Sequence, residues 1–181
     1  MNIFALDIDV EKAAQYHVSR HSVKMIVEYS QLLSTAHRIL DGSSEQRLTK
    51  TGRRSTAWRL GDERESILYS ATHINHPSAI WCRETSGNYI WLQSLLAALC
   101  KEYTYRYGRI HKCESDGLLK ALERLPDNIP HADMTPVRLA MPDEFKMLDF
   151  VESYRNYYRL GKQHLHNWSG RINSRPQPAW I

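Results

Sequence analysis

Residues 17–38, HVSRHSVKMIVEYSQLLSTAHR, carry the pattern that most constrains how this chain can fold. On a helix of about 3.6 residues per turn, six polar side chains of this stretch form one stripe. They are His17, His21, Lys24, Glu28, Gln31 and Thr35. The rest of the circumference is largely apolar, whereas an ordinary surface helix has a narrow apolar stripe. We therefore expect a helix that is buried on most sides, with its polar stripe facing either a cleft or solvent. If the stripe faces solvent, Lys24 and Glu28 form a simple i,i+4 ion pair.

The remaining pattern is also helical. Asp9 can cap a first helix, which bends near Ser19 and ends at Gly42 in the left-handed conformation. Further helices are expected at residues 77–85, 89–107, 115–125 and 142–168. Little of the chain has a strand pattern, so we expect an all-α fold: a single compact domain of four to five helices over residues 1–181, with an extended tail over 169–181.

Residues 43–72 differ in character and form a basic loop or insertion. From 46 to 61 there are five basic residues and no acidic one. STAWRL and SILYSAT predict a small β-hairpin within 55–72, turning at Gly61-Asp62. The alternatives for this segment are phosphate contacts and a merely solvated loop. The candidate phosphate ligands are Arg47, Lys50, Arg53, Arg54 and Arg59.

Composition bounds the compartment and the partner. The net charge of +4 and the pI near 9.0 are compatible with a polyanion. Three cysteines without a CxxC pair indicate reduced thiols, and no apolar run approaches the ~18 residues of a membrane span. We expect a cytoplasmic monomer that has a polyanionic partner and contacts no membrane.

Two chemistries fit the polar stripe. His17 and His21 are four residues apart and could bind a metal together with His76, as in a metal-dependent hydrolase of nucleotides or nucleic acids, although no HExxH motif is present. The other chemistry pairs Glu28 with an amine, which can form an imine with a sugar carbon while the carboxylate moves protons. Nearby cations such as Arg20 and His21 would keep that amine partly neutral.

Two segments bear a family resemblance. In HSVKMIVEYSQLL, Lys24, Glu28 and Gln31 match a K-x3-E-x2-Q pattern, and His21 to Glu28 matches an H-x6-E spacing. INHPSAIW, residues 74–81, is similar to an NHPA-x3-W motif. On these motifs the chain resembles pyrimidine-dimer DNA glycosylases of the bacteriophage endonuclease V type and their short bacterial relatives.

The resemblance implies an all-α enzyme that needs no metal or other cofactor, flips a nucleotide out of duplex DNA and uses Glu28 as its catalytic carboxylate. It implies activity on damaged or modified pyrimidines in a bacterial or phage-infected cell. We further expect His17, Arg20, Gln31, Asn75 and His76 to contact the double-stranded DNA. In the phage enzyme the nucleophile is the α-amine of a threonine exposed by removal of Met, whereas residue 2 here is asparagine. The nucleophile could then be the amine of Met1, of Asn2 or of Lys24, and a DNA-binding protein without catalysis remains a further alternative.

Overall fold

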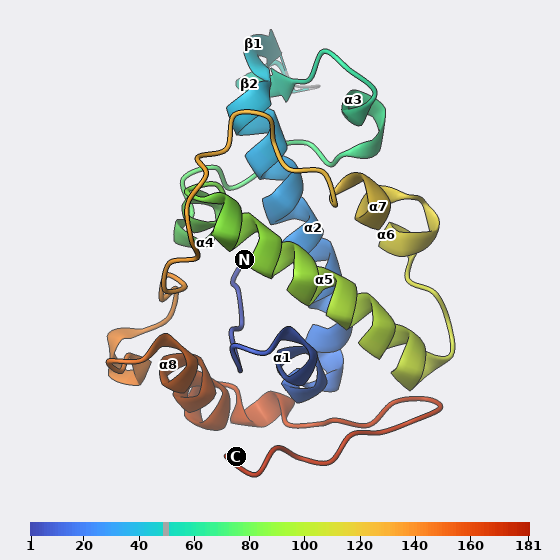
Figure 1. The fold of residues 1–181 in the computed structure, drawn as a ribbon, viewed down its shortest axis with the longest axis vertical. Helices are drawn as coiled ribbons and strands as arrows, with labels where there is room; N and C mark the ends of the chain where they lie inside the picture. Colours follow the sequence, from blue (N-terminus) through green and yellow to red (C-terminus); the bar gives the residue numbers. More distant parts are fainter. Residues whose placement is uncertain (49–50) are drawn as a thin grey trace.

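The computed structural model describes residues 1–48 and 51–181 and is mainly helical with one small hairpin. Two long helices, α2 (Ser19–Asp41) and α5 (Ser86–Tyr107), cross and pack against each other at its centre (Figure 1). Shorter helices surround them: α1 (Val10–Tyr16), α3 (Arg64–Ile67), α4 (Pro77–Cys82), α6 (Lys112–Ser115), α7 (Leu118–Ala121) and α8 (Phe150–Asn156). The expected mainly helical character is confirmed, although the eight α-helices of the described residues exceed the predicted four to five.

Local sequence explains the ends of these helices. The Asp9 side chain caps α1 by accepting from the backbone amides of residues 11 and 12. Thr85 caps α5 in the same way, and Gly108 ends that helix in the left-handed conformation, at φ 65°. Gly42 follows α2 but is extended, at φ −91°, so the predicted left-handed end is wrong there. A Cβ at Gly42 would meet the carbonyl oxygens of Arg38 and Arg59, which explains the glycine by close approach of two backbones.

The predicted helix over 142–168 is broken into four parts. They are a 3-10 turn at Asp143–Phe145, α8, a π-helical turn at Tyr157–Gly161 and a 3-10 turn at Gln163–Leu165. The break before α8 has a local cause, because the Asp149 side chain accepts from the Glu152 amide while the Ser153 hydroxyl accepts from the Met147 amide. These side chains start a new helix where the sequence pattern alone predicted a continuous one.

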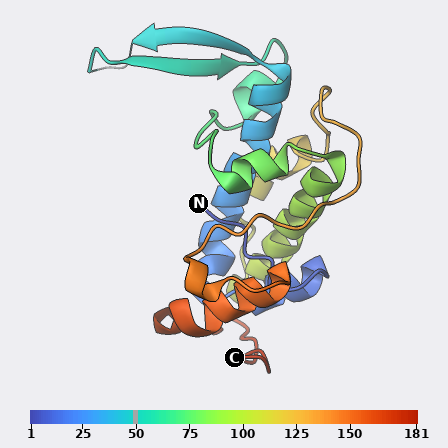
Figure 2. The same ribbon diagram turned by 90° about the vertical axis from the view of Figure 1, so that its left-hand side faces the viewer.

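The hairpin lies earlier in the chain than predicted. Strands β1 (Ser43–Leu48) and β2 (Arg54–Arg59) pair antiparallel, with Ser43 opposite Arg59 and Leu48 opposite Arg54. Gly61 and Asp62 instead lead into α3, so the predicted turn there is wrong. Figure 2 shows the hairpin projecting from the end of α2, away from the helical body.

A buried arginine joins the base of the hairpin to the body. Arg38 of α2 donates to the carbonyl of Trp58 in β2 at 2.9 Å and to Glu65 of α3 at 2.6 Å. It also donates to the carbonyls of Leu68 and Tyr69 at 2.8 and 2.6 Å. Since a buried guanidinium is stable only when its donors are satisfied, this network holds the hairpin at a fixed position on α2.

The N-terminal residues form an extended arm within the core. Side chains of Ile3, Phe4, Ala5 and Leu6 are buried, and the arm lies between α2 and α8 (Figure 1). The three cysteines, Cys82, Cys100 and Cys113, are free thiols and buried in the core. No helix among residues 1–48 and 51–181 combines the length and the apolar character that crossing a lipid bilayer requires.

Candidate active site

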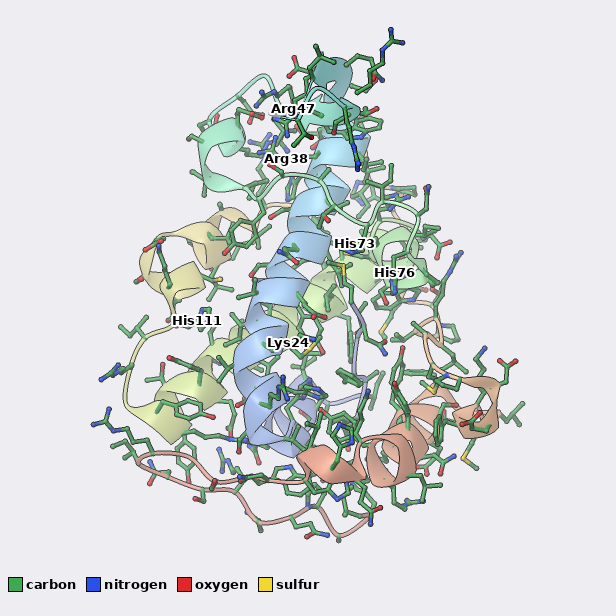
Figure 3. The ribbon with its side chains drawn as sticks, turned by 180° about the vertical axis from the view of Figure 1, so that it is seen from behind. Lys24, Arg38, Arg47, His73, His76 and His111 are labelled. Carbon is green, nitrogen blue, oxygen red and sulfur yellow. The ribbon has the colours of Figure 1, made fainter. Side chains whose placement is uncertain are left out.

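A pocket of about 250 Å³ lies where the N-terminal arm meets α2. Met1 and Asn2 of the arm line it, together with Lys24 and Glu28 of α2 and Lys162, which follows the π-helical turn. Figure 3 shows Lys24 on the face of the molecule that also carries His73 and His76. The pocket therefore collects two kinds of amine and a carboxylate from distant parts of the chain.

Glu28 is the centre of this group. Its Oε1 lies 3.0 Å from the Lys24 ammonium, and its Oε2 lies 4.0 Å from the α-amine of Met1. The backbone N–H of Asn2 donates to the same Oε2 at 3.3 Å. The Glu28 side chain is 14% exposed, whereas that of Lys24 is 60% exposed. Glu28 thus has one sheltered neighbour at the N-terminus and one solvated neighbour on its own helix.

The side chain of residue 2 fixes the N-terminus in place. Asn2 donates through Nδ2 to the carbonyl of Ala140 at 2.9 Å and accepts through Oδ1 from the Tyr154 hydroxyl at 3.0 Å. The next anchor is Phe4, whose N–H donates to the Tyr29 hydroxyl at 3.0 Å. The arm cannot shift without breaking these bonds, so the backbone nitrogens of residues 1 and 2 stay beside Glu28.

His21 lines the pocket as a neutral ring. Its Nδ1 lies 2.6 Å from the Tyr158 hydroxyl, and the ring stacks on Phe4 at 4.5 Å between centroids. Burial lowers the pKa of His21 to about 3, and the positive charges of Lys24, Lys162 and Arg20 act in the same direction. His21 therefore carries no charge near neutral pH, and the prediction that it supplies a nearby cation is wrong.

His17 is a core residue and contacts no ligand space. It precedes α2, and both ring nitrogens are used: Nδ1 lies 2.7 Å from the carbonyl of Ala13, and Nε2 lies 3.1 Å from the Tyr29 hydroxyl. The residue is fully buried. The predicted DNA contact of His17 is thus replaced by a role in holding Tyr29, which in turn accepts from the N-terminal arm.

Acid should destabilise the fold through His17. Burial lowers its pKa to about 4, whereas an unfolded histidine titrates near pH 6.5. Between these values the unfolded chain binds a proton at His17 that the folded chain excludes, so His17 makes the free energy of unfolding fall as the pH falls, by up to about 1.4 kcal/mol per pH unit. Urea denaturation from about pH 6.5 down to about pH 5 measures the summed slope, to which the lowered pKa values of His21 and His37 also contribute, and His17→Gln should make it shallower by about 1 kcal/mol per pH unit. Equal slopes for the two proteins would contradict the assignment.

The alternative metal site finds no support in the geometry. Within the described part of the chain, no three side chains of histidine, cysteine, aspartate or glutamate converge in a way that could hold an ion. His17 has both nitrogens engaged in the core, and His21 has one on Tyr158. The Nδ1 of His76 accepts from the Ser78 amide at 3.2 Å. The three predicted ligands are therefore committed to separate structural bonds.

The turn at Asn75-His76-Pro77 lies close to the pocket. His76 caps α4, with Pro77 as the first helical residue. Burial is the main cause that lowers the pKa of His76, followed by the positive N-terminus and His73, while Glu28 opposes them. The turn is thus within electrostatic range of the Glu28 site. Asn75 is exposed, and its side chain forms no hydrogen bond with any other described residue.

Substitutions in this turn should separate capping from DNA contact. His76→Ala should lower the free energy of unfolding by about 1 kcal/mol, since the helix loses its cap. Asn75→Ala should change that free energy by less than about 0.5 kcal/mol. On the DNA contact that we expect for Asn75, the same substitution should reduce turnover instead, because its side chain is exposed. Urea denaturation and activity per folded molecule give both quantities. If Asn75→Ala instead lost stability and kept full turnover, Asn75 would be the residue that caps the helix and would have no role in DNA contact.

The other predicted DNA ligands lie in two places. Arg20 is exposed in the first turn of α2, and Gln31 is half-buried about one turn beyond Glu28. Thr35, at the far end of the predicted stripe, is buried and accepts from the Thr72 amide at 3.2 Å, so the stripe does not face one cleft along its whole length. The basic segment lies on the hairpin, far from the pocket.

Within the hairpin the arginines are not equivalent. Arg59 lies 2.7 Å from Glu45 and 2.7 Å from Glu65, so its guanidinium is occupied and the predicted phosphate contact is not supported. Arg47, Arg53 and Arg54 are exposed. Lys50 lies outside the described residues.

Sequence reasoning missed one wall of the pocket. Tyr157 and Lys162 line it from the π-helical turn and just after it, with the Lys162 ammonium 4.7 Å from the Tyr157 ring centroid. Ala140 contributes its carbonyl from the proline-rich connector. An aromatic pair followed by lysine in a predicted helix gives no signal that it reaches residue 2, because that contact depends on the tertiary fold.

The arrangement offers nucleophilic and proton-transfer chemistry. A sheltered carboxylate beside an α-amine can hold the amine in place, stabilise positive charge on its nitrogen and exchange protons with it. Comparison of the chain with protein-family models, curated proteins and solved structures finds no significant match to any of them.

Proposed function

We propose that this protein is a DNA glycosylase with lyase activity, acting on damaged or modified pyrimidines in duplex DNA. The observation that carries the proposal is the contact of Glu28 with the N-terminal backbone, at 4.0 Å from the α-amine and 3.3 Å from the next backbone nitrogen. The DNA substrate is proposed because the motifs around Glu28 and Asn75 resemble those of the pyrimidine-dimer DNA glycosylases.

The chemistry can be written for these groups. The unprotonated amine attacks C1′ of the sugar, the bond from C1′ to the base breaks, and the base leaves with the bonding electrons and takes up a proton. The nitrogen loses a proton and the C1′–O4′ bond of the sugar ring breaks; its electrons go to O4′, which takes up a proton, and a protonated imine is left between the nitrogen and C1′. Glu28 stabilises positive charge on nitrogen and moves the protons. Removal of a proton from C2′ then expels the 3′ phosphate, which is the lyase step.

The size of the pocket is consistent with this chemistry. A volume of about 250 Å³ is below the roughly 300–1,000 Å³ of sites that enclose a drug-sized ligand. A pocket of this volume can hold a sugar at its opening more readily than a whole nucleotide in its interior. The enzyme must then expose C1′ by extruding the nucleotide from the stack, as other enzymes that act on bases do.

Borohydride trapping tests the proposal directly. Borohydride reduces an imine to a stable amine, so the reacting protein becomes covalently linked to its DNA strand. Duplexes carrying an abasic site, a pyrimidine dimer or a modified pyrimidine form the panel, with an undamaged duplex as control. We expect a linked species on the abasic duplex and on one class of damaged pyrimidine. Absence of any linked species would remove the imine mechanism, and activity abolished by a chelator would favour the metal-dependent hydrolase.

A further inference from the structure

The hairpin β1–β2 is an arm with a fixed base and an open outer part. Arg38 and Glu65 hold its base through Trp58 and Arg59. All six side chains of β1 are exposed, and Leu48 near the tip is 69% exposed. An isolated two-stranded hairpin is marginally stable in water, so an arm of this kind gains stability from a partner that covers it.

The charge of the arm selects the partner. Arg47 and Arg54 are exposed, and neither pairs with an acidic side chain in the described part of the chain. Glu45, the one acid of the two strands, is engaged by Arg59 at 2.7 Å. From 46 to 61 the sequence holds no acid. The outer hairpin therefore presents positive charge without compensation, which complements a polyanion.

The shape of the arm and its direction narrow the choice further. The major groove of B-DNA admits a two-stranded β-ribbon, and arginine can bind the O6 and N7 atoms of guanine there. Figure 2 shows the hairpin projecting on the side of α2 where the N-terminus lies. The helical rise of about 1.5 Å per residue places the end of α2 about 25 Å from Lys24 along the helix axis. The hairpin projects across that axis (Figure 2), so a duplex that runs parallel to α2 meets it about seven base pairs from the pocket.

We infer that the hairpin enters the major groove of duplex DNA, about seven base pairs to one side of the nucleotide held at the Glu28 pocket. The inference rests on the proposed function for the DNA at the pocket. It adds a second, distant contact, made by a segment that carries none of the residues proposed for catalysis. The footprint on DNA is then asymmetric, extending toward the side of the hairpin.

The test uses the full chain and a duplex of about thirty base pairs whose central nucleotide is a tetrahydrofuran abasic-site analogue. Arg47→Ala/Arg54→Ala removes two exposed charges from the arm. Arg109→Ala/Arg171→Ala is the matched control, since both residues are exposed near the distal end of α5. Affinity is measured over a range of salt concentrations, and protection of guanine N7 from dimethyl sulfate reports the major groove.

We expect the hairpin variant to bind at least about tenfold more weakly and to lose guanine protection about seven base pairs to one side of the analogue. The control variant should keep that protection. An unchanged protection pattern in the hairpin variant, or equal losses in both variants, would overturn the inference while borohydride trapping at the pocket could still succeed. If the wild-type chain did not bind the duplex at all, that result would contradict both the proposed function and the inference that the hairpin binds DNA.

Discussion

Glu28→Gln should slow turnover by at least about a hundredfold while the fold and the affinity for DNA are retained. The amide keeps the shape of the side chain and an oxygen for the Asn2 N–H, which now donates to Glu28 at 3.3 Å. It loses the negative charge that stabilises a cationic nitrogen and the ability to exchange a proton. Single-turnover kinetics on the substrate identified by trapping, with DNA affinity measured in parallel, give the two quantities.

The matched control is Glu11→Gln. Glu11 pairs with Lys101 at 3.2 Å on the surface, away from the pocket, so the same charge is removed from another lysine–glutamate pair. If Glu28 were only the partner of Lys24, both variants would cost less than about 1 kcal/mol in stability and would leave turnover unchanged. That result would exclude Glu28 as the catalytic carboxylate.

Blocking the N-terminus should abolish the borohydride-trapped species, whereas Lys24→Ala should leave it. The α-amine of Met1 is sheltered beside Glu28 at 4.0 Å, while Lys24 is 60% exposed and oriented on the other carboxylate oxygen. As a class, α-amines are deprotonated in a larger fraction at neutral pH than lysine side chains, which favours them as nucleophiles. Removal of Met1 would leave the nitrogen of Asn2 as the amine, at 3.3 Å from the same oxygen.

Digestion of the trapped complex with trypsin locates the bond independently of any variant. Cleavage after Lys12 releases residues 1–12, which carry the DNA if an α-amine reacted. Reaction at Lys24 would block cleavage there and give DNA on residues 21–38. The mass of the N-terminal peptide also shows whether Met1 or Asn2 is the first residue. DNA on the second peptide would contradict the α-amine mechanism.

The helices that sequence predicted best are those with both periodicity and caps. The end of α5 at Tyr107 follows from Gly108, and the start of α1 follows from Asp9. After Pro142, periodicity alone predicted one continuous helix. That prediction failed because side-chain hydrogen bonds of Asp149 and Ser153 start a new helix there. The hairpin failed for another reason: alternation in STAWRL is compatible with pairing on either side, and only its contact with Arg38 and the close approach at Gly42 select the earlier strand.

For the site, the polar stripe on an apolar helix identified Glu28 and Lys24, because that information is local. The same stripe wrongly included His17, since a histidine bonded within the core has the same spacing as one facing a ligand. The contribution of Tyr157 and Lys162 could not be predicted, because they reach the pocket only through packing of α8 and its π-helical extension against the arm. Conversely, the sequence left the nucleophile open among the amines of Met1, Asn2 and Lys24. The nitrogens of Met1 and Asn2 lie next to Glu28 in the structure, which favours an N-terminal amine.

The anchoring of Asn2 has a consequence for the order in which the protein matures. Its partners, Ala140 and Tyr154, lie 138 and 152 residues further along the chain. A nascent polypeptide on the ribosome has its N-terminus from the first moment of synthesis, but that terminus has no fixed place until Tyr154 has been translated and α8 has folded. Aborted translation products that stop earlier would carry Glu28 and the amine without holding them together. On the proposed function, the imine-forming site would therefore be assembled only in chains translated at least as far as Tyr154.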